Sequence, residues 1–385
     1  MRKLYNTNSQ ITSDLSKFFK IVAPSIISKP HLKNSTDVIL GMIKYESVVT
    51  TDIVKNLKDL WSETQPSSTV RRLERFFNNT LFKPYNFYDS IIQYVIKNYK
   101  SKNKNVYISF DHTFCRESFT ILFFSLRVGK QGIPLWFRCF KGNNDPKAFE
   151  LNLIKEGISY VHSLFENSDY KLIFLADRWF NFREIMHHID SLGHEYCIRT
   201  KSNIAIEIDN YEDSPMIAYI SDIEPFFSKS RYFDSVRITS FKFPTKLAVS
   251  KTDTHKEPFF ILTNGNTREA IKHYGYRFGS IEFIFKNQKS NGFYLESTKM
   301  RNIQAFTTMF TLLCVAVLWL TILGAYYSKN KGHFKNYFKI KYSKKNGASN
   351  KRIISLFNTG LLFFNIAFES TKYVLLKCDF LLYDI

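Results

Sequence analysis

Several common signals are missing from this sequence of 385 residues. Its five cysteines form no C-x-x-C pair and are odd in number, which favours a reducing compartment and argues against a zinc framework. Residues 1–6 lack the apolar core of a secretory signal peptide. Neither G-x-x-x-x-G-K-S/T nor G-x-G-x-x-G occurs, so no nucleotide cofactor is implied. We therefore predict a cytoplasmic protein.

Negative charge is scarce, because 34 Asp and Glu residues oppose 54 Lys and Arg residues, a formal net charge of +20. Such an excess fits a polyanionic partner, either nucleic acid or an anionic membrane surface. An AT-rich gene, which favours lysine codons, is an alternative explanation of the charge. With 23% charged and 44% hydrophobic residues the composition is globular, and the length suggests two or three domains.

Charge is absent altogether from residues 302–328, and residues 305–326 are almost wholly apolar. As a helix, the apolar stretch would span about 33 Å, which is enough to cross a bilayer. We predict a buried core helix instead, because four threonines interrupt the stretch and a helix with a candidate site residue closely precedes it. A membrane-associated protein anchored by this segment is the alternative; no membrane partner is expected.

Residues 1–100 read as a helical, basic region. Apolar periodicity predicts one helix over residues 37–43, with a capping residue at its start, and another over residues 54–60. A third helix follows Pro66, where serines can act as caps. Its basic residues project away from its apolar face; they are Arg71, Arg72 and Arg75. This arrangement resembles a DNA-binding helix-turn-helix, and a small bundle with a basic solvated face is an equally good interpretation.

From residue 101 the pattern changes to alternating strands and helices. Residues 101–203 predict the first part of a mixed-sheet α/β core, with strands over 106–111, 119–128, 134–140, 171–177 and 195–199 and helices over 146–165 and 182–192. Residues 204–266 predict a β-rich insertion, and residues 267–328 return to helix and complete the core. Residues 329–385 predict a basic segment with C-terminal helices. The segment 329–352 is a candidate for phosphate contacts, and a solvated loop is the alternative.

Three acidic residues stand at informative places in this pattern. Asp111 and Asp177 each end a run of strand-forming residues, and Glu282 lies in a stretch typical of a helix. Aspartate is common at strand ends, so each residue by itself has a structural explanation. Two neighbouring parallel strands and a helix would bring the three carboxylates together, and their mutual repulsion favours the binding of cations. Mg²⁺ suits such carboxylates, and a pair of divalent ions can cut and rejoin phosphodiester bonds.

Three motifs around these acids, Ile108–Thr113, Leu175–Phe180 and Ser280–Phe293, resemble those of DDE transposases from bacterial insertion sequences. The chain is similar to the IS-four family in particular, which has a Tyr, Arg, Glu, Lys signature, and the resemblance covers roughly residues 100–325. It implies a ribonuclease-H-like core in which the three acids hold two Mg²⁺ ions, which Mn²⁺ can replace. It also implies cut-and-paste transposition of DNA by a homodimer. A catalytically decayed relic that only binds DNA is the alternative.

The resemblance also implies DNA contacts for several basic and aromatic residues, namely Tyr274, Arg277, Lys289, Arg199 and Lys201. Four residues separate Arg277 from Glu282 where the family has three, so either Gly279 marks a local bulge or Arg277 is not the equivalent residue. Lys286 shares one helical face with Glu282 and Lys289, and a solvated stripe of charges is the alternative. For Trp179, packing in the core is preferred to stacking on a flipped base.

Overall fold

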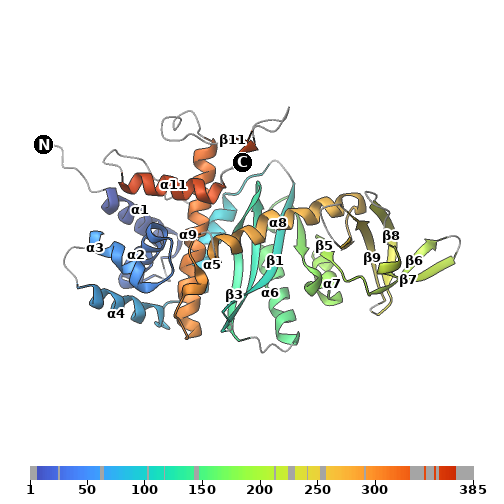
Figure 1. Ribbon diagram of the computed structural model, residues 1–385, viewed down its shortest axis with the longest axis horizontal. Helices are drawn as coiled ribbons and strands as arrows, with labels where there is room; N and C mark the ends of the chain where they lie inside the picture. The colour runs from blue at the N-terminus through green and yellow to red at the C-terminus, as the bar shows by residue number, and fades with distance from the viewer. Residues whose placement is uncertain are drawn as a thin grey trace.

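The computed structural model describes residues 7–24, 27–60, 65–101, 104–116, 118–142, 147–211, 214–223, 230–240, 242–251, 257–289, 292–329, 342–343, 351–352 and 355–369. Its centre is a ten-stranded mixed sheet in the order β3-β2-β1-β4-β5-β10-β9-β8-β6-β7, flanked by helices (Figure 1). The strands are β1 Asn105–Cys115, β2 Phe119–Val128, β3 Gln131–Lys141, β4 Lys171–Ala176, β5 Glu195–Arg199, β6 Ala205–Tyr211, β7 Ser214–Tyr219, β8 Ser230–Ile238, β9 Phe243–Ser250 and β10 Phe259–Thr263. The predicted mixed α/β class is confirmed.

The first five strands form the half of the sheet that the strand patterns predicted. β1, β2 and β3 are antiparallel neighbours, and β1, β4 and β5 are parallel ones. The parallel connections run through helices α6 (Lys147–Phe165) and α7 (Arg183–Ser191) and the 3-10 turn η1 (Arg178–Phe180). Parallel neighbours need such crossovers, and their ends then meet at one edge of the sheet.

The strands of segment 204–266 extend this sheet and do not form a sheet of their own. β10 pairs antiparallel with β5, and β9, β8, β6 and β7 follow outward from it, with the 3-10 turn η2 (Ile220–Ile223) after β7. In Figure 1 the hairpin of β6 and β7 lies at the far end of the molecule from the N-terminus. The predicted strand content of this segment is confirmed, and the sheet is continuous because β10 takes the edge of β5.

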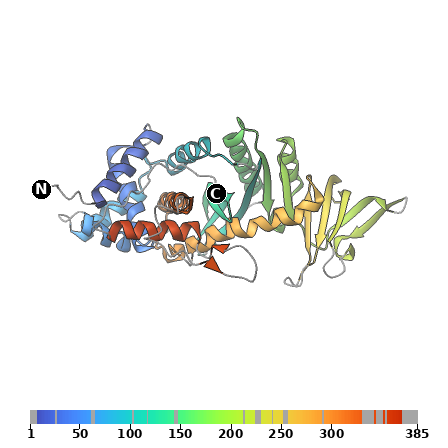
Figure 2. The same ribbon diagram turned by 90° about the horizontal axis from the view of Figure 1, so that it is seen from above.

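The remaining helices, apart from α8, gather at the other end of the molecule (Figure 1). They are α1 Thr7–Val22, α2 Lys29–Tyr45, α3 Thr50–Leu60, α4 Pro66–Phe77, α5 Pro84–Lys97, α8 Thr267–Lys289, α9 Ile303–Lys329 and α11 Leu356–Glu369, with the 3-10 turn η3 Leu295–Ser297. Helix α8 differs from the rest because it runs lengthwise along one side of the sheet (Figure 2). Two short strands, β11 Tyr342–Ser343 and β12 Lys351–Arg352, pair with each other.

Helix α9 is the core of the helical end. Among the described helices it is the one long and apolar enough to cross a membrane, and its most apolar 18-residue window is 100% buried within the protein. In Figure 2 it is seen end-on, with the N-terminal helices and α11 around it. A Cβ atom at Gly324 would lie 1.8 Å from the carbonyl oxygen of Leu356, so glycine permits the close crossing of α9 and α11. The prediction of a buried core helix is confirmed.

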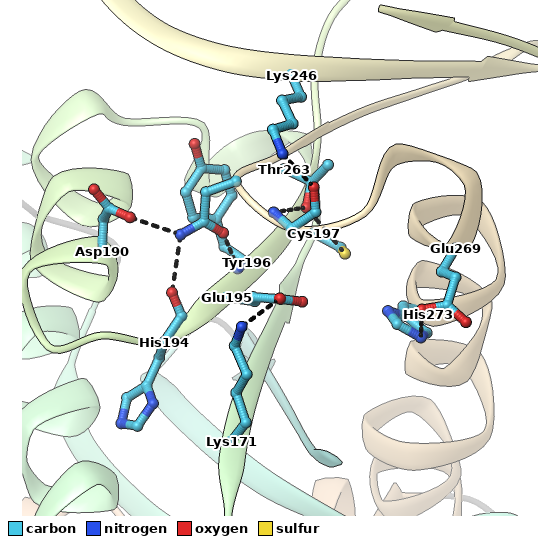
Figure 3. A network of polar contacts seen from close by, with 12 residues as sticks. Lys171, Asp190, His194, Glu195, Tyr196, Cys197, Lys246, Thr263, Glu269 and His273 are labelled. Carbon is cyan, nitrogen blue, oxygen red and sulfur yellow. Dashed lines mark hydrogen bonds and ion pairs between the residues drawn. The ribbon is translucent and has the colours of Figure 1, made fainter. Parts of the chain in front are cut away.

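Helix α8 is anchored to the sheet at its N-terminal end. Figure 3 shows this network, in which Lys171 pairs with Glu195 at 2.7 Å and Lys246 Nζ donates to the carbonyl oxygen of Gly265. Asn264, just before the helix, accepts a hydrogen bond from the Tyr196 amide at 3.0 Å. The contacts of Lys246 and Tyr196 join β9 and β5 to the turn that precedes α8, and the Lys171–Glu195 pair joins β4 to β5.

Some predicted boundaries are wrong. β1 continues past Asp111 to Cys115, because β2 pairs with it along this whole length. Helix α2 begins at Lys29 with Ser28 as its cap, so residues 37–43 lie inside it. Helix α4 begins at Pro66 after Gln65, so the serines are helical residues and not caps. Most of segment 329–352 and all of residues 370–385 lie outside the described residues.

Candidate active site

Strands β1 and β4 place two of the acids side by side. Their parallel register reaches Ser109 opposite Leu175, and Asp111 and Asp177 each stand two residues further along. Because side chains alternate across a strand, Asp111 lies on the same face as Tyr107, whose ring packs on α8. The predicted parallel pairing of the two strands is present, but the predicted strand ends match only for Asp177, because Asp111 lies within β1.

Helix α8 supplies the third acid together with a cation. Arg277 Nη1 donates a hydrogen bond to Glu282 Oε1 at 3.1 Å, and Arg277 Nη2 donates one to Asp111 Oδ2. One guanidinium therefore joins the acid on β1 to the acid on α8. The Arg277 side chain is only 5% exposed, whereas that of Glu282 is 48% exposed, so the cluster meets solvent on the side of Glu282.

Burial and crowding make the charges of these carboxylates unfavourable. Burial raises the pKa of Asp111 above its ordinary value, and Asp177 raises it further, while Arg277 and His112 act in the opposite direction. Burial likewise raises the pKa of Glu282, with Arg277 opposing and the two aspartates adding to the effect. Three carboxylates thus lie near a single guanidinium, and a further cation would favour their charged forms.

Carboxylates crowded in this way fit a divalent cation, since Mg²⁺ prefers oxygen ligands. Asp111, Asp177 and Glu282 are the residues that would hold it. Within the described ranges, however, no three His, Cys, Asp or Glu side chains are spaced to bind a metal ion as they stand. Both Asp111 and Glu282 instead contact the guanidinium of Arg277. The acids of β1 and α8 converge on an arginine and not on an ion-sized gap.

Gly279 marks a close approach and not a bulge. Residues 267–289 form one uninterrupted α-helix. A Cβ atom at Gly279 would lie 2.8 Å from the carbonyl oxygen of Lys130, in the turn between β2 and β3. Glycine at this position lets α8 lie against that turn. The first explanation for the spacing of Arg277 is therefore wrong, and its side chain reaches Glu282 across five positions of a regular helix.

The other predicted residues of α8 lie in different environments. Tyr274 is 2% exposed and packs against Phe259, and burial raises its pKa to about 12. Lys286 is exposed. Lys289 Nζ donates to the Phe114 carbonyl oxygen at 2.6 Å and thus ties α8 to the end of β1. Of these three side chains, Lys286 is the one exposed to solvent.

Arg199 ends β5, one residue past the pairing of Ile198 with Ala176 of β4, and Lys201 follows the strand. Arg199 Nη2 contacts Glu257 Oε2 at 3.1 Å, and its guanidinium lies over the Phe259 ring, 5.1 Å from the centroid. Arg178 contacts the same carboxylate at 3.5 Å. Lys201 is exposed. Glu257 therefore holds two basic side chains close to the acid cluster, a role that the sequence analysis missed.

The three arginines of α4 do not act alike. Arg71 and Arg75 are exposed and line one open surface hollow of about 600 Å³. Arg72 instead turns inward, and its Nη2 contacts Asp37 Oδ2 of α2 at 2.9 Å. Asp37 is 1% exposed, so this is an internal ion pair between helices. Arg72 therefore does not share the solvent-facing surface of Arg71 and Arg75.

Two further side chains border the site. The His112 amide donates to Asp111 Oδ1 at 2.8 Å, and burial lowers the pKa of the His112 imidazole. Its ring lies 5.6 Å from that of Trp179. Trp179 is 54% exposed, so the preferred interpretation of core packing is wrong. Both residues stand within two positions after a site aspartate, and this closeness in sequence was the signal that could have identified them. The sequence alone does not show whether their side chains are exposed.

Comparison with known proteins identifies a family for the sheet and the helices described above. Residues 126–319 match the family described as Transposase DDE domain, which is just over half of the chain. The matched range includes Asp177 and Glu282 but begins after Asp111. The assignment of Asp111 to the same site therefore depends on its contact with Arg277 and not on the family match. None of the curated proteins matches this chain.

Several solved structures match as well. One is an X-ray crystal structure of Marinitoga piezophila Argonaute in complex with 5′ OH guide RNA and target DNA, at 15% identity and a TM-score of 0.23. The match covers 63% of this chain and 33% of the Argonaute chain, so this chain spans about a third of that protein's length. A similarity this low carries no argument here. The fold and the family match together give a ribonuclease-H-like core, and the chain belongs to the family of transposases with a DDE domain.

Proposed function

We propose that this chain is a metal-dependent DNA transposase that uses Asp111, Asp177 and Glu282 to cut DNA at the ends of an insertion sequence and to join it to a target. The observation that carries the proposal is the convergence of acids from separate elements. Asp111 and Glu282 share one guanidinium, and Asp177 is close enough to raise the pKa of both. The membership of the DDE family supports the same reaction class.

The three acids would hold divalent ions, with Mg²⁺ as the natural choice and Mn²⁺ as a substitute. Bound ions of this kind activate the attacking oxygen and stabilise the leaving oxygen of a phosphodiester. The chain itself positions the ligands. The His112 amide orients Asp111, the Arg178 amide donates to Asp177 Oδ1 at 2.7 Å, and the contact of Lys289 with β1 holds α8 in place.

Basic surfaces on either side of the site would bind the DNA. The net charge of +20 supports a polyanionic substrate, and Arg71, Arg75, Lys201 and Lys286 are exposed basic side chains of the sheet and helices described. In this proposal residues 1–100 recognise the terminal repeats, and two copies of the chain act together on paired ends. The IS-four subgroup and its Tyr, Arg, Glu, Lys signature are part of the same proposal, with Tyr274 as the tyrosine. Arg277 enters it through its contact with Glu282 and not through its spacing, which is one residue longer than that of the family.

The test is cleavage of linear DNA that carries the inverted repeats flanking the gene, in Mg²⁺ or Mn²⁺. Asp111→Asn, Asp177→Asn and Glu282→Gln should each reduce nicking at least about 1,000-fold, which corresponds to about 4 kcal/mol of transition-state stabilisation. Binding of the same DNA, measured by anisotropy, should change little. Wild-type cleavage by any one of the three variants would remove that residue from the active site.

Asp169→Asn is a matched control. Asp169 lies just before β4, at the opposite end of the strand from Asp177, and its side chain is 89% exposed in a pair with Lys104. Its loss should leave cleavage unchanged. DNA binding by the wild type without cleavage in either metal would instead identify a decayed relic.

A further inference from the structure

Arg277 occupies an unusual position for a DNA-contacting residue, because its guanidinium is inside the acid cluster. It contacts Asp111 and Glu282, and its side chain is only 5% exposed. Its Nε is buried and donates no hydrogen bond within the part of the chain that the structure describes. A guanidinium has five N–H donors in a fixed fork. Arg277 is therefore held by charge, with part of its donor capacity unused.

The guanidinium and a metal ion compete for the same oxygen atoms. Arg277 engages Asp111 Oδ2 and Glu282 Oε1, one oxygen of each of two carboxylates that would hold a divalent ion. Cations this close also repel each other, and screening is weak at a buried site. As long as Arg277 makes both contacts, its charge and its hydrogen bonds oppose the binding of a metal ion by these two carboxylates.

The arginine has an alternative partner when DNA is present. Guanidinium groups bind phosphate in the same forked manner as carboxylate. A DNA backbone that enters on the exposed side, where Glu282 is 48% accessible, brings phosphates next to the cluster. Moving from two carboxylates to a phosphate would satisfy Arg277 and free the acids in one step.

We propose that Arg277 is a positioning residue that holds Asp111 and Glu282 in the DNA-free protein and releases them when DNA phosphate arrives, so that metal loading is coupled to DNA binding. The inference rests on the proposed function, since it takes the three acids as metal ligands. The consequence is an order of binding. The DNA-free protein binds metal weakly, and DNA binds first and frees the carboxylates for metal. A transposase built this way carries little loaded metal before its DNA is in place.

The coupling is measured by Mn²⁺ binding, with electron paramagnetic resonance to count free ion and with no catalytic turnover. Arg277→Gln should bind Mn²⁺ about 10-fold more tightly than wild type without DNA, a coupling of ordinary size. A short duplex of the terminal repeat should tighten Mn²⁺ binding to wild type by a similar factor, and it should hardly affect Arg277→Gln. Arg277→Lys, which keeps the charge without the fork, should lie between the two.

Glu282→Gln in both backgrounds shows that the counted ion is at this site, because it should weaken binding whether or not Arg277 is present. Equal or weaker Mn²⁺ binding by folded Arg277→Gln, while Glu282→Gln still reduces binding, would overturn the role of Arg277 and leave the metal site intact. Mn²⁺ binding that is insensitive to Glu282→Gln, with and without DNA, would overturn the proposed metal site and this inference with it. If Arg277→Gln does not fold, Arg277→Lys with and without DNA gives the same decision.

Discussion

Two arginine–aspartate pairs lie inside this protein, one in the helical end and one at the sheet, and they differ in how many acids each arginine faces. Arg72 of α4 contacts Asp37 of α2 at 2.9 Å, with the arginine 29% and the aspartate 1% exposed. Arg277 of α8 contacts Asp111 of β1 and also Glu282. The first pair joins two helices. In the second, one cation serves a cluster of acids that includes Asp177 nearby.

The comparison separates a structural ion pair from a site. A charge removed from water is costly unless it is paired, so one aspartate with one arginine is a stable internal contact. Additional acids next to the same arginine repel one another and add no contact that packing requires. Burial raises the pKa of Asp111 and of Glu282, and the neighbouring acids add to this rise. A fold that keeps such a cluster has a use for cations there.

The largest expected difference is in the response of stability to the loss of each arginine. Arg72→Met leaves Asp37 buried without its partner arginine, so the free energy of unfolding should fall by about 3 kcal/mol, whether or not Mg²⁺ is present. Arg277→Met should also destabilise the protein in chelator, because the acids then repel each other unopposed. Excess Mg²⁺ should recover that loss, since a ligand that binds the native state stabilises it by mass action. Urea unfolding in EDTA and in Mg²⁺ measures both.

The comparison would fail if Mg²⁺ rescued Arg72→Met as well, or rescued neither variant. A general salt effect is controlled by Ca²⁺-free buffer at matched ionic strength, with NaCl in place of MgCl₂. Rescue confined to Arg277→Met would locate the cation effect at the acid cluster.

A smaller difference is expected between the two aspartates. Asp37→Asn removes the charge that holds Arg72 and should cost about 2 kcal/mol, less than a full buried pair because Arg72 is partly exposed. For Asp111 the sign is reversed: a carboxylate whose folded pKa is raised costs stability when it is charged, above that pKa. Asp111→Asn should therefore be neutral or gain up to about 1 kcal/mol in EDTA at neutral pH. A loss as large as that of Asp37→Asn would mean that Asp111 is structural.

The sequence predicted the sheet side of this comparison better than the helical side. The strands that deliver Asp111 and Asp177 have strong apolar runs, and the helix that carries Glu282 has no competing strand pattern, so local preference and tertiary structure agree. The parallel pairing of β1 with β4 then brings Asp111 and Asp177 to neighbouring positions. The mixed sheet, the acids and the buried α9 could all be predicted from such local signals.

The direction in which a side chain points could not be predicted from the sequence. Arg71, Arg72 and Arg75 are alike in sequence, and only the position of Asp37 on another helix decides that Arg72 turns inward. Arg277 is similar, because its contact with Asp111 spans 166 positions of the chain. The continuation of the sheet through β10 could not be predicted either, because the sequence of an edge strand does not specify which strand pairs with it.

A further prediction concerns the contact of α8 with the β2–β3 turn, because α8 carries Arg277 and Glu282 of the acid cluster. Gly279→Ala gains about 1 kcal/mol of helix propensity but places a Cβ 2.8 Å from the Lys130 carbonyl oxygen, a backbone atom. Overpacking of this kind costs about 1–3 kcal/mol, so the net change should be a loss of about 1 kcal/mol with weakened Mn²⁺ binding. Gly275→Ala on the same helix meets no atom within 4 Å and should stabilise the protein. Equal stabilisation by both substitutions would show that α8 does not rest on the β2–β3 turn.

The smallest effect is expected from the arginines of α4 that face solvent, and it tests the helical end as a DNA surface. Replacing Arg71 and Arg75 with Gln should leave stability unchanged, because both are exposed and surface charges contribute little to it. If each contacts a phosphate, DNA affinity should fall for all sequences, and the salt dependence of binding should decrease by about one unit per arginine. Arg72→Gln is the matched variant with the opposite profile, since its internal pair with Asp37 supports the fold and its loss should leave the salt slope alone. An unchanged slope in the Arg71 and Arg75 double variant would place the DNA surface elsewhere and leave α4 as a structural helix.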